Sequence, residues 1–243
     1  DVITDNKELM AVSTDAAHVR GYALELVRLH SDAGEAEVAE ILRRSPSVVI
    51  QGARSSLTGG ATPDGSVVLD MSRQDKILDI GKDSITVQPG ITLRALQEVL
   101  AAEGKYYPPG PTFDGATMGG MIATNAAGAA TFKYGQTRPW VKGLTVVLAS
   151  GEVVEMKRGQ YTAHPDGYFE LERATGETQH IPIPAYKMPD VPKSSAGYYA
   201  RPNMDLIDFF IGSEGTLGVV TEATLRIIPK PTISWALVSC QSE

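Results

Sequence analysis

The sequence predicts an α+β fold in which helices alternate with mixed strands along the chain. Residues 22–29 and 219–228 carry the alternating or continuous apolar runs that are typical of strands. Residues 35–44 and 92–103 place their apolar side chains largely on one helical face. The 24 glycines and 15 prolines among 243 residues exceed the usual share, so turns or backbone close to a ligand must hold the surplus.

The first part of the chain follows a strand–helix–strand order. Asp32, with Ser31 before it and Glu35 three residues beyond it, predicts a capping box at the start of the first helix. Residues 47–50 predict a buried strand. This strand leads into residues 51–60, a loop of small and hydroxylated side chains with many free backbone N–H groups.

Further strands are predicted by the apolar runs at residues 67–70, 77–80 and 85–88. A helix at residues 92–103 follows, with Thr92 as its N-cap and Gly104 at its C-terminal end. Its predicted buried stripe comprises Leu93, Leu96, Val99 and Leu100. The proline-rich residues 107–111 must be extended, and residues 117–128 gather small side chains at the start of a short helix.

The remaining predicted strands are residues 141–149, 153–156 and 219–228, the first two joined by a turn at Ser150 and Gly151. Residues 157–200 are polar and rich in proline and tyrosine. They predict a long surface hairpin followed by an irregular loop, with an interaction surface as the alternative. Residues 229–231 indicate a domain boundary, and residues 233–240 predict a strand that opens a second domain.

Composition and charge exclude several classes of function. The 22 Lys and Arg against 29 Asp and Glu give a net charge of −7, and no basic run is long enough to follow a nucleic acid. The single cysteine, Cys240, excludes a disulfide framework and favours a reducing, cytoplasmic setting. The four histidines lack metal-sharing spacings, and no apolar run has the length of a membrane helix. We therefore expect no metal site, no nucleic-acid partner and no transmembrane segment.

Three glycine-rich segments remain as candidate binding elements: residues 51–60, 111–128 and 212–219. The chain lacks the nucleophile elbow, the P-loop and the Rossmann glycine fingerprint, which excludes three common enzyme classes. Each segment alone is more often a turn than a ligand site. Together they indicate an anion site, because successive unpaired N–H groups can hold a diphosphate without a cluster of basic side chains.

Ordered motifs also carry a family resemblance. They are residues 52–59 (GARSSLTG), 87–90 (VQPG), 108–111 (PPGP), 116–128 (ATMGGMIATNAAG), 133–135 (KYG) and 212–223 (GSEGTLGVVTEA). The chain resembles the FAD-binding, PCMH-type domain of the vanillyl-alcohol oxidase / p-cresol methylhydroxylase superfamily. Within it, the sequence is most similar to glycolate oxidase FAD subunits and D-lactate dehydrogenases, over about residues 20–156 and 193–231.

The resemblance implies a PCMH-type FAD-binding fold, with two α/β subdomains and FAD between them. The FAD domain would span residues 1–231, with the first subdomain at about 20–110 and the second at 111–231. Residues 157–200 would be a hairpin insertion in the second subdomain. Residues 232–243 would begin a cap domain, which binds substrate and is absent from this chain.

The resemblance also implies the cofactor contacts. The first loop would hold the FAD diphosphate mainly through backbone N–H groups and continue beneath the flavin. The second segment would wrap the ribityl and ribose region, where a side chain at Gly119 or Gly120 would push the backbone away from the cofactor. The third would hold the adenosine end. The implied residues are Gln51, Gly52, Ala53, Arg54, Ser55, Ser56, Leu57, Thr58, Pro111, Thr112, Thr117, Gly119, Gly120, Thr124, Asn125, Ala126, Gly128, Glu214, Gly218, Val219 and Val220.

Two positions depart from the family pattern. Arg54 stands where glycine is commonest, so either the backbone needs no positive φ there or the guanidinium lies near the diphosphate or the substrate. We favour the second interpretation. Ser55 stands where members with covalent flavin carry histidine, so we expect non-covalent FAD.

The implied reaction is FAD-dependent oxidation of a small 2-hydroxy acid, such as D-lactate or glycolate, by hydride transfer to flavin N5. The alternatives are an FAD-binding subunit without turnover and a flavoenzyme similar to alkylglycerone-phosphate synthase. The family's catalytic base lies largely in the cap domain, so this chain alone is expected to be incomplete for catalysis. Tyr134 and Arg138 are the candidates for the rim of the site. The alternative for Tyr134 is a packed aromatic side chain, and the alternative for Arg138 is a surface ion pair. A cap domain, a partner subunit or a homo-oligomer, and a location peripheral to the inner face of a membrane, remain open.

Overall fold

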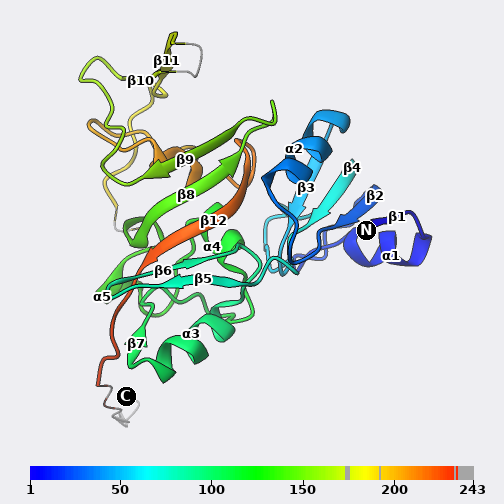
Figure 1. Cartoon of the computed structure of the whole chain (residues 1–243), viewed down its shortest axis with the longest axis horizontal. Coiled ribbons are helices and arrows are strands. Elements are labelled where there is room, and N and C mark those ends of the chain that lie inside the picture. Colours follow the sequence, from blue (N-terminus) through cyan, green and yellow to red (C-terminus); the bar gives the residue numbers. More distant parts are fainter. Residues whose placement is uncertain (173–175, 192, 233, 235–243) are drawn as a thin grey trace, which may run out of the picture.

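The computed structural model describes residues 1–172, 176–191, 193–232 and 234, and its strands build one large sheet in each of two lobes (Figure 1). The first lobe contains β1 (Val2–Ile3), α1 (Asn6–Val12), β2 (Tyr22–Arg28), α2 (Glu35–Arg44), β3 (Val48–Gln51) and β4 (Asp64–Asp70). Its sheet has the order β1-β2-β4-β3, with β2, β4 and β3 parallel and β1 antiparallel at one edge. The two helices cover opposite faces, because Val67 and Leu69 pack with α2 whereas Val68 packs with α1.

The bounds of α2 agree with the sequence prediction, but the predicted capping box is wrong. The N-cap of α2 is Gly34, and no side chain caps it. Asp32 instead pairs with Lys76, and the Glu35 carboxylate accepts a hydrogen bond from Thr221 Oγ1 at 3.2 Å. Lys76, just before β5 (Ile77–Ile80), and Thr221, in β12 (Val219–Arg226), therefore hold the two side chains, Asp32 and Glu35, that were expected to cap the helix.

The second lobe is built on a five-stranded antiparallel sheet in the order β5-β6-β12-β8-β9. These strands are β5 (Ile77–Ile80), β6 (Ser84–Val87), β8 (Val141–Val147), β9 (Val153–Lys157) and β12 (Val219–Arg226). Four helices lie with it: α3 (Leu93–Ala102), α4 (Met118–Ala123), α5 (Thr131–Tyr134) and α6 (Ile207–Phe210), and a 3-10 turn spans Arg138–Trp140. A small pair joins β7 (Lys105–Tyr106) to β13 (Ile228–Pro229). No described helix has the length and hydropathy that a membrane span requires.

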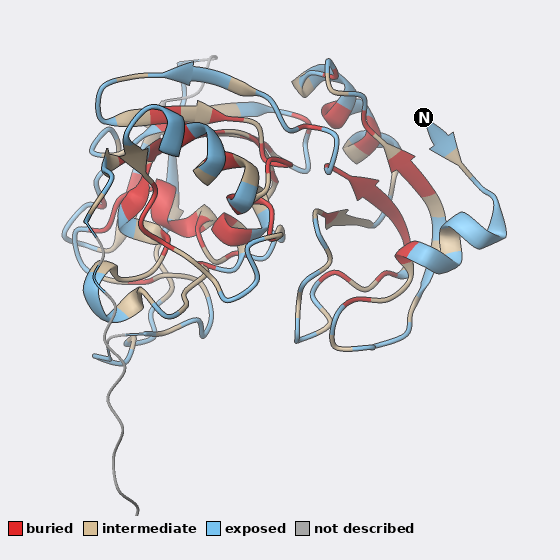
Figure 2. Cartoon of the chain, turned by 90° about the horizontal axis from the view of Figure 1, so that it is seen from below, coloured by how far each residue is buried: buried red, intermediate tan, exposed pale blue. Residues whose placement is uncertain are grey.

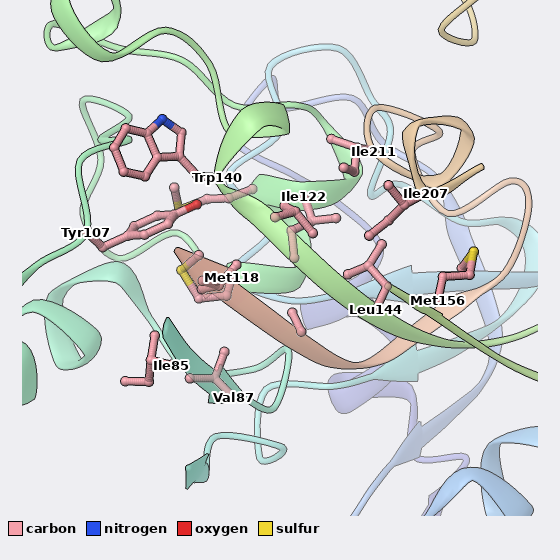
Figure 3. Packing of buried hydrophobic residues seen from close by; sticks show 14 of the residues in the cluster. Ile85, Val87, Tyr107, Met118, Ile122, Trp140, Leu144, Met156, Ile207 and Ile211 are labelled. Atoms are coloured by element: carbon pink, nitrogen blue, oxygen red, sulfur yellow. The ribbon is translucent and has the colours of Figure 1, made fainter. Parts of the chain in front are cut away.

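One face of this sheet holds the main hydrophobic core, and Figure 2 shows buried stretches in both lobes. Figure 3 shows Leu144 on β8 and Val87 on β6 facing Met118 and Ile122 of α4, with Ile207 of α6 beside them. The predicted N-cap of α3 is confirmed, since Thr92 Oγ1 accepts from Ala95 N at 3.2 Å. Its predicted stripe is wrong at one position: Val99 is 37% exposed, because it lies at the edge of the buried face.

The predicted subdomain boundary near residue 110 does not match the sheets. The two large sheets separate between β4 and β5, because β6 pairs with β12 far along the sequence, with Val87 opposite Ala223. Residues 77–102 therefore belong to the second lobe.

Residues 157–200 contain the predicted hairpin, formed by β10 (Tyr168–Glu172) and β11 (Thr178–Pro182). The hairpin projects from the lobe in Figure 1, yet one face of it is packed. Phe169 is 1% exposed and lies edge-on to Phe209, with 5.5 Å between the ring centroids, and Leu171 and Ile181 contact the same core. The strand predicted at residues 233–240 lies outside the described residues, apart from residue 234.

Candidate functional site

A cavity lies between the two lobes, and three glycine-rich segments meet there. It holds about 570 Å³ of empty space, part of which is open to solvent. The end of β3, the region of α4 and the turn between α6 and β12 form its walls. The lining residues are Ile50, Gln51, Gly52, Met71, Pro89, Thr117, Gly119, Gly120, Ala123, Phe210, Ser213, Glu214, Gly215, Gly218 and Val220.

The loop that follows β3 supplies free backbone donors. Within the described part of the chain, the N–H groups of residues 52–57 make no hydrogen bond, whereas Thr58 N donates to Ser56 Oγ at 3.2 Å. Gly52 packs directly against α4: a Cβ there would lie 2.1 Å from Thr117 Oγ1. Its lack of a side chain therefore keeps this loop and the N-cap of α4 in contact.

Gln51 anchors the base of this loop and is buried, at 1% exposure. Its Nε2 donates to Val12 O at 2.8 Å and to Ala61 O at 2.6 Å. Its Oε1 accepts no hydrogen bond from any described residue. The side chain of Gln51 therefore ties the end of β3 to the end of α1 and to residue 61, and its Oε1 is shielded from solvent.

The start of α4 presents small residues rather than free donors. Met118 N donates to Ile91 O at 2.9 Å, Gly119 N to Pro89 O at 2.8 Å, and Gly120 N to Thr117 Oγ1 at 3.3 Å. A Cβ on Gly119 would lie 2.7 Å from Pro89 Cβ, so Pro89, and not only the cofactor, requires glycine there. A Cβ on Gly120 would meet only Thr117 Oγ1, at 3.2 Å, so this position alone matches the expected open approach.

The third wall is a turn at residues 212–218 with several backbone positions in the left-handed region. The φ angles are +52° at Glu214 and +78° at Gly215. Glu214 N donates to Ala123 O at 2.8 Å, which joins the turn to α4. The Glu214 carboxylate also approaches the first loop, since a Cβ on Gly60 would lie 3.1 Å from Glu214 Oε2. The turn therefore reaches both other walls.

Eight of the residues implied by the family resemblance line the cavity: Gln51, Gly52, Thr117, Gly119, Gly120, Glu214, Gly218 and Val220. The rest of the first loop is not among the lining residues; Ala53, Ser55, Leu57 and Thr58 are exposed, and Arg54 and Ser56 are half-buried. Pro111 and Ala126 are half-buried, and Thr112 and Thr124 are exposed, also outside the lining.

Three further implied residues have roles within the protein itself. Asn125 is buried, donates from Nδ2 to Gln136 Oε1 at 2.9 Å and accepts from Arg138 N at 2.9 Å. A Cβ on Gly128 would lie 1.9 Å from Gly110 O. Val219 is buried in the core of the first lobe. Hydrogen bonding and close packing therefore account for these three.

Arg54 has a φ of +52°, so the interpretation that its backbone needs no positive φ is wrong. Its carbonyl accepts from Ala16 N at 3.0 Å. Among the described residues, its guanidinium has no ion-pair partner. An unpaired cation therefore stands on the loop that supplies the free amides.

Neither rim candidate lines the cavity. Tyr134 lies edge-on to Trp140, with 6.1 Å between ring centroids, and Lys133 sits 5.0 Å from its ring, as expected for the packed-aromatic alternative. The Arg138 side chain is only 14% exposed and pairs with Asp208 at 3.4 Å, so the surface ion-pair alternative is wrong. Burial lowers the pKa of the Arg138 guanidinium, and the Asp208 carboxylate opposes that effect.

The lining residues that the sequence did not single out are mostly apolar: Ile50, Met71, Pro89, Ala123 and Phe210, together with Ser213 and Gly215. Pro89 lies in one of the ordered motifs, and Ser213 and Gly215 lie within the third glycine-rich segment. Apolar residues such as Ile50 and Met71 look the same in a sequence whether they fill a core or line a cavity.

Two lobes with a cleft of free amides and small residues define a nucleotide-cofactor-binding protein of the α+β class. The chain belongs to the FAD binding domain family, whose model matches residues 29–157. This confirms the predicted family and fold, and FAD as the cofactor.

Similar proteins agree with this assignment. A D-lactate dehydrogenase of Anaerostipes hadrus is 36% identical over 187 residues, which are 76% of this chain and 32% of that protein. The glycolate oxidase subunit GlcD of Bacillus subtilis is 33% identical over 196 residues, 79% of this chain and 34% of that protein. The solved alkyldihydroxyacetonephosphate synthase shares the fold, with a TM-score of 0.70 at 19% identity, over 96% of this chain and 38% of that one. The chain thus spans about a third of the length of the curated relatives that it matches.

Proposed function

We propose that this chain is the FAD-binding part of an FAD-dependent oxidoreductase that oxidises a small 2-hydroxy acid, such as D-lactate or glycolate. The observation that carries the FAD site is the cavity between the lobes, where unpaired amides and small residues meet. The substrate class rests on similar proteins named D-lactate dehydrogenase, glycolate oxidase subunit and D-2-hydroxyglutarate dehydrogenase. Their names refer to 2-hydroxy acids in each case.

The residues of the cavity fit FAD. The free N–H groups of residues 52–57, on the loop that enters the cavity at Gly52, suit a diphosphate. Gly120 leaves room for a flat ring, and the apolar side chains of Met71 and Phe210 exclude water. When bound, FAD would supply the two-electron acceptor for oxidation of the carbinol carbon.

We also propose that the catalytic base comes from a cap domain or a partner subunit. Glu214 is the one ionisable residue among those that line the cavity, and the resemblance places it at the adenosine end. The chain would then bind and orient the cofactor while other residues bind the acid. FAD would be non-covalent, because Ser55 cannot form a histidyl link, and the reducing setting indicated by composition would be cytoplasmic.

The visible spectrum tests this proposal in the protein that carries this chain. We expect flavin absorption bands after incubation with FAD, and anaerobic bleaching of those bands by D-lactate, glycolate or D-2-hydroxyglutarate. Absence of flavin bands would refute the binding site. Stable bands that no 2-hydroxy acid bleaches would refute the reaction and favour a subunit without turnover or the alkyl-transfer chemistry.

A further inference from the structure

The turn at residues 212–218, which forms the third wall of the cavity, has one backbone hydrogen bond within it among the described residues, from Thr216 N to Ser213 O at 3.1 Å. Its backbone enters the left-handed region repeatedly, with φ of +90° at Gly212 and +52° at Glu214. Among the described residues, Gly215 N, Leu217 N and Gly218 N make no hydrogen bond. Contacts from outside the turn must therefore contribute to its shape.

One such contact is the buried guanidinium of Arg138. It donates from Nη1 to Asp208 O and from Nη2 to Ile211 O, the carbonyl immediately before the turn. A Cβ on Gly212 would lie 3.3 Å from Arg138 Nη2, so the guanidinium packs against the first residue of the turn as well. Tyr199 covers the cation, with 4.1 Å from Arg138 Cζ to the ring centroid.

The neighbouring residue supplies a second contact. Tyr198 Oη lies 2.7 Å from Thr216 Oγ1, in the middle of the turn. Thr216 Oγ1 in turn donates to Ser213 O, at 2.6 Å, and Ser213 lines the cavity. Both tyrosines belong to the stretch that follows the hairpin and lies beyond residue 157, where the match to the family model ends.

We propose that Tyr198, Tyr199 and Arg138 are positioning residues that hold the turn 212–218 in its cofactor-binding shape. The polar segment after residue 157 thereby controls how tightly FAD is held. This inference rests on the proposed FAD site, but the shape of the turn can be measured without FAD.

The test compares Tyr198→Phe and Arg138→Lys with matched controls. Tyr198→Phe removes only an exposed hydroxyl, so the fold should persist. Its control is Tyr168→Phe in the same segment, whose hydroxyl makes no hydrogen bond with any described residue. The control for Arg138→Lys is Arg158→Lys: Arg158 also contacts Asp208, and it donates to Val141 O and Arg138 O, but it makes no hydrogen bond to Ile211 O.

We expect flavin fluorescence titration to give FAD dissociation constants about fivefold weaker for Tyr198→Phe and roughly tenfold or more for Arg138→Lys, with both controls within about twofold of wild type. Without FAD, hydrogen exchange at the amides of residues 213–218 should be faster in Tyr198→Phe than in Tyr168→Phe. Wild-type protein that binds no FAD would refute the proposed function, and the exchange measurement would still decide this inference. Unchanged exchange, or equal affinities in variants and controls, would overturn it.

Discussion

Replacing Gly52 with alanine should destabilise the protein through one identified contact. The added Cβ would lie 2.1 Å from Thr117 Oγ1, far inside normal contact distance, and 3.2 Å from Thr117 Cβ, which is tighter than most real contacts. Thr117 is buried and caps α4 by accepting from Gly120 N, so it cannot move without losing that bond. Overpacking of about 1–3 kcal/mol and loss of an N-cap worth about 1 kcal/mol predict a total of roughly 2–4 kcal/mol.

Urea unfolding of four proteins measures this effect: wild type, Gly52→Ala, Thr117→Ala and the double variant. Thr117→Ala removes Oγ1, the atom that clashes, and leaves only Cβ, at 3.2 Å, so the double variant should cost little more than Thr117→Ala alone. We expect a favourable coupling free energy of at least about 1 kcal/mol. Gly110→Ala is the control, since a Cβ there meets no atom within 4 Å, and should change stability by less than about 0.5 kcal/mol. Additive costs for the two single substitutions would refute the proposed clash.

Three other variants test the charged groups. Burial raises the pKa of Glu222 above its ordinary value of 4.5, and nearby carboxylates raise it further. The folded state then binds the proton of Glu222 more tightly than the unfolded state does. The free energy of unfolding therefore falls as pH rises from 4.5 through the raised pKa. In Glu222→Gln, thermal melts across that pH range should no longer show this decrease in stability. An unchanged slope of stability against pH would contradict the assignment. Asp208→Asn should cost about 2–4 kcal/mol in urea unfolding, because Arg138 and Arg158 lose their buried carboxylate; a change below about 0.5 kcal/mol would contradict this. Arg54→Gly should stabilise the free protein by about 1 kcal/mol by relieving a positive φ, yet weaken FAD binding; unchanged FAD affinity would exclude the guanidinium from the site.

Local signals in the sequence predicted most of the helices and strands. Thr92 caps α3, and Gly104 ends that helix region with a φ of +65°, both as the residue types indicate. The capping box at Asp32 failed because α2 begins at Glu35 with Gly34 as its N-cap, and the Asp32 carboxylate pairs instead with a lysine 44 residues away. A local pattern cannot report such a partner.

The long-range arrangement could not be predicted in the same way. Thr86 and Thr224 lie opposite each other in β6 and β12, with their hydroxyl oxygens 3.0 Å apart, although 138 residues separate them. Their pairing assigns the whole stretch from β5 to α3 to the second lobe. The alternation of side chains within one strand does not show which distant strand pairs with it. The boundary between the sheets therefore lies between β4 and β5 and not near residue 110, where it was expected.

The glycine pattern was the most informative signal for the site, but the glycines are required for two different reasons: contacts within the protein, and space for a cofactor. Gly52 is required by Thr117, Gly119 by Pro89 and Gly128 by the Gly110 carbonyl, all contacts made within the protein itself. The first of these contacts holds the loop after β3 against α4, and the other two hold α4 and the segment after it against residues 89 and 110, before any ligand arrives. Among the described residues, the free amides of residues 52–57, Gly215 and Gly218 and the open side of Gly120 are left for a cofactor. A cavity whose walls are already held together loses little conformational entropy on binding, so most of the glycines favour FAD by preorganising the site rather than by touching the cofactor.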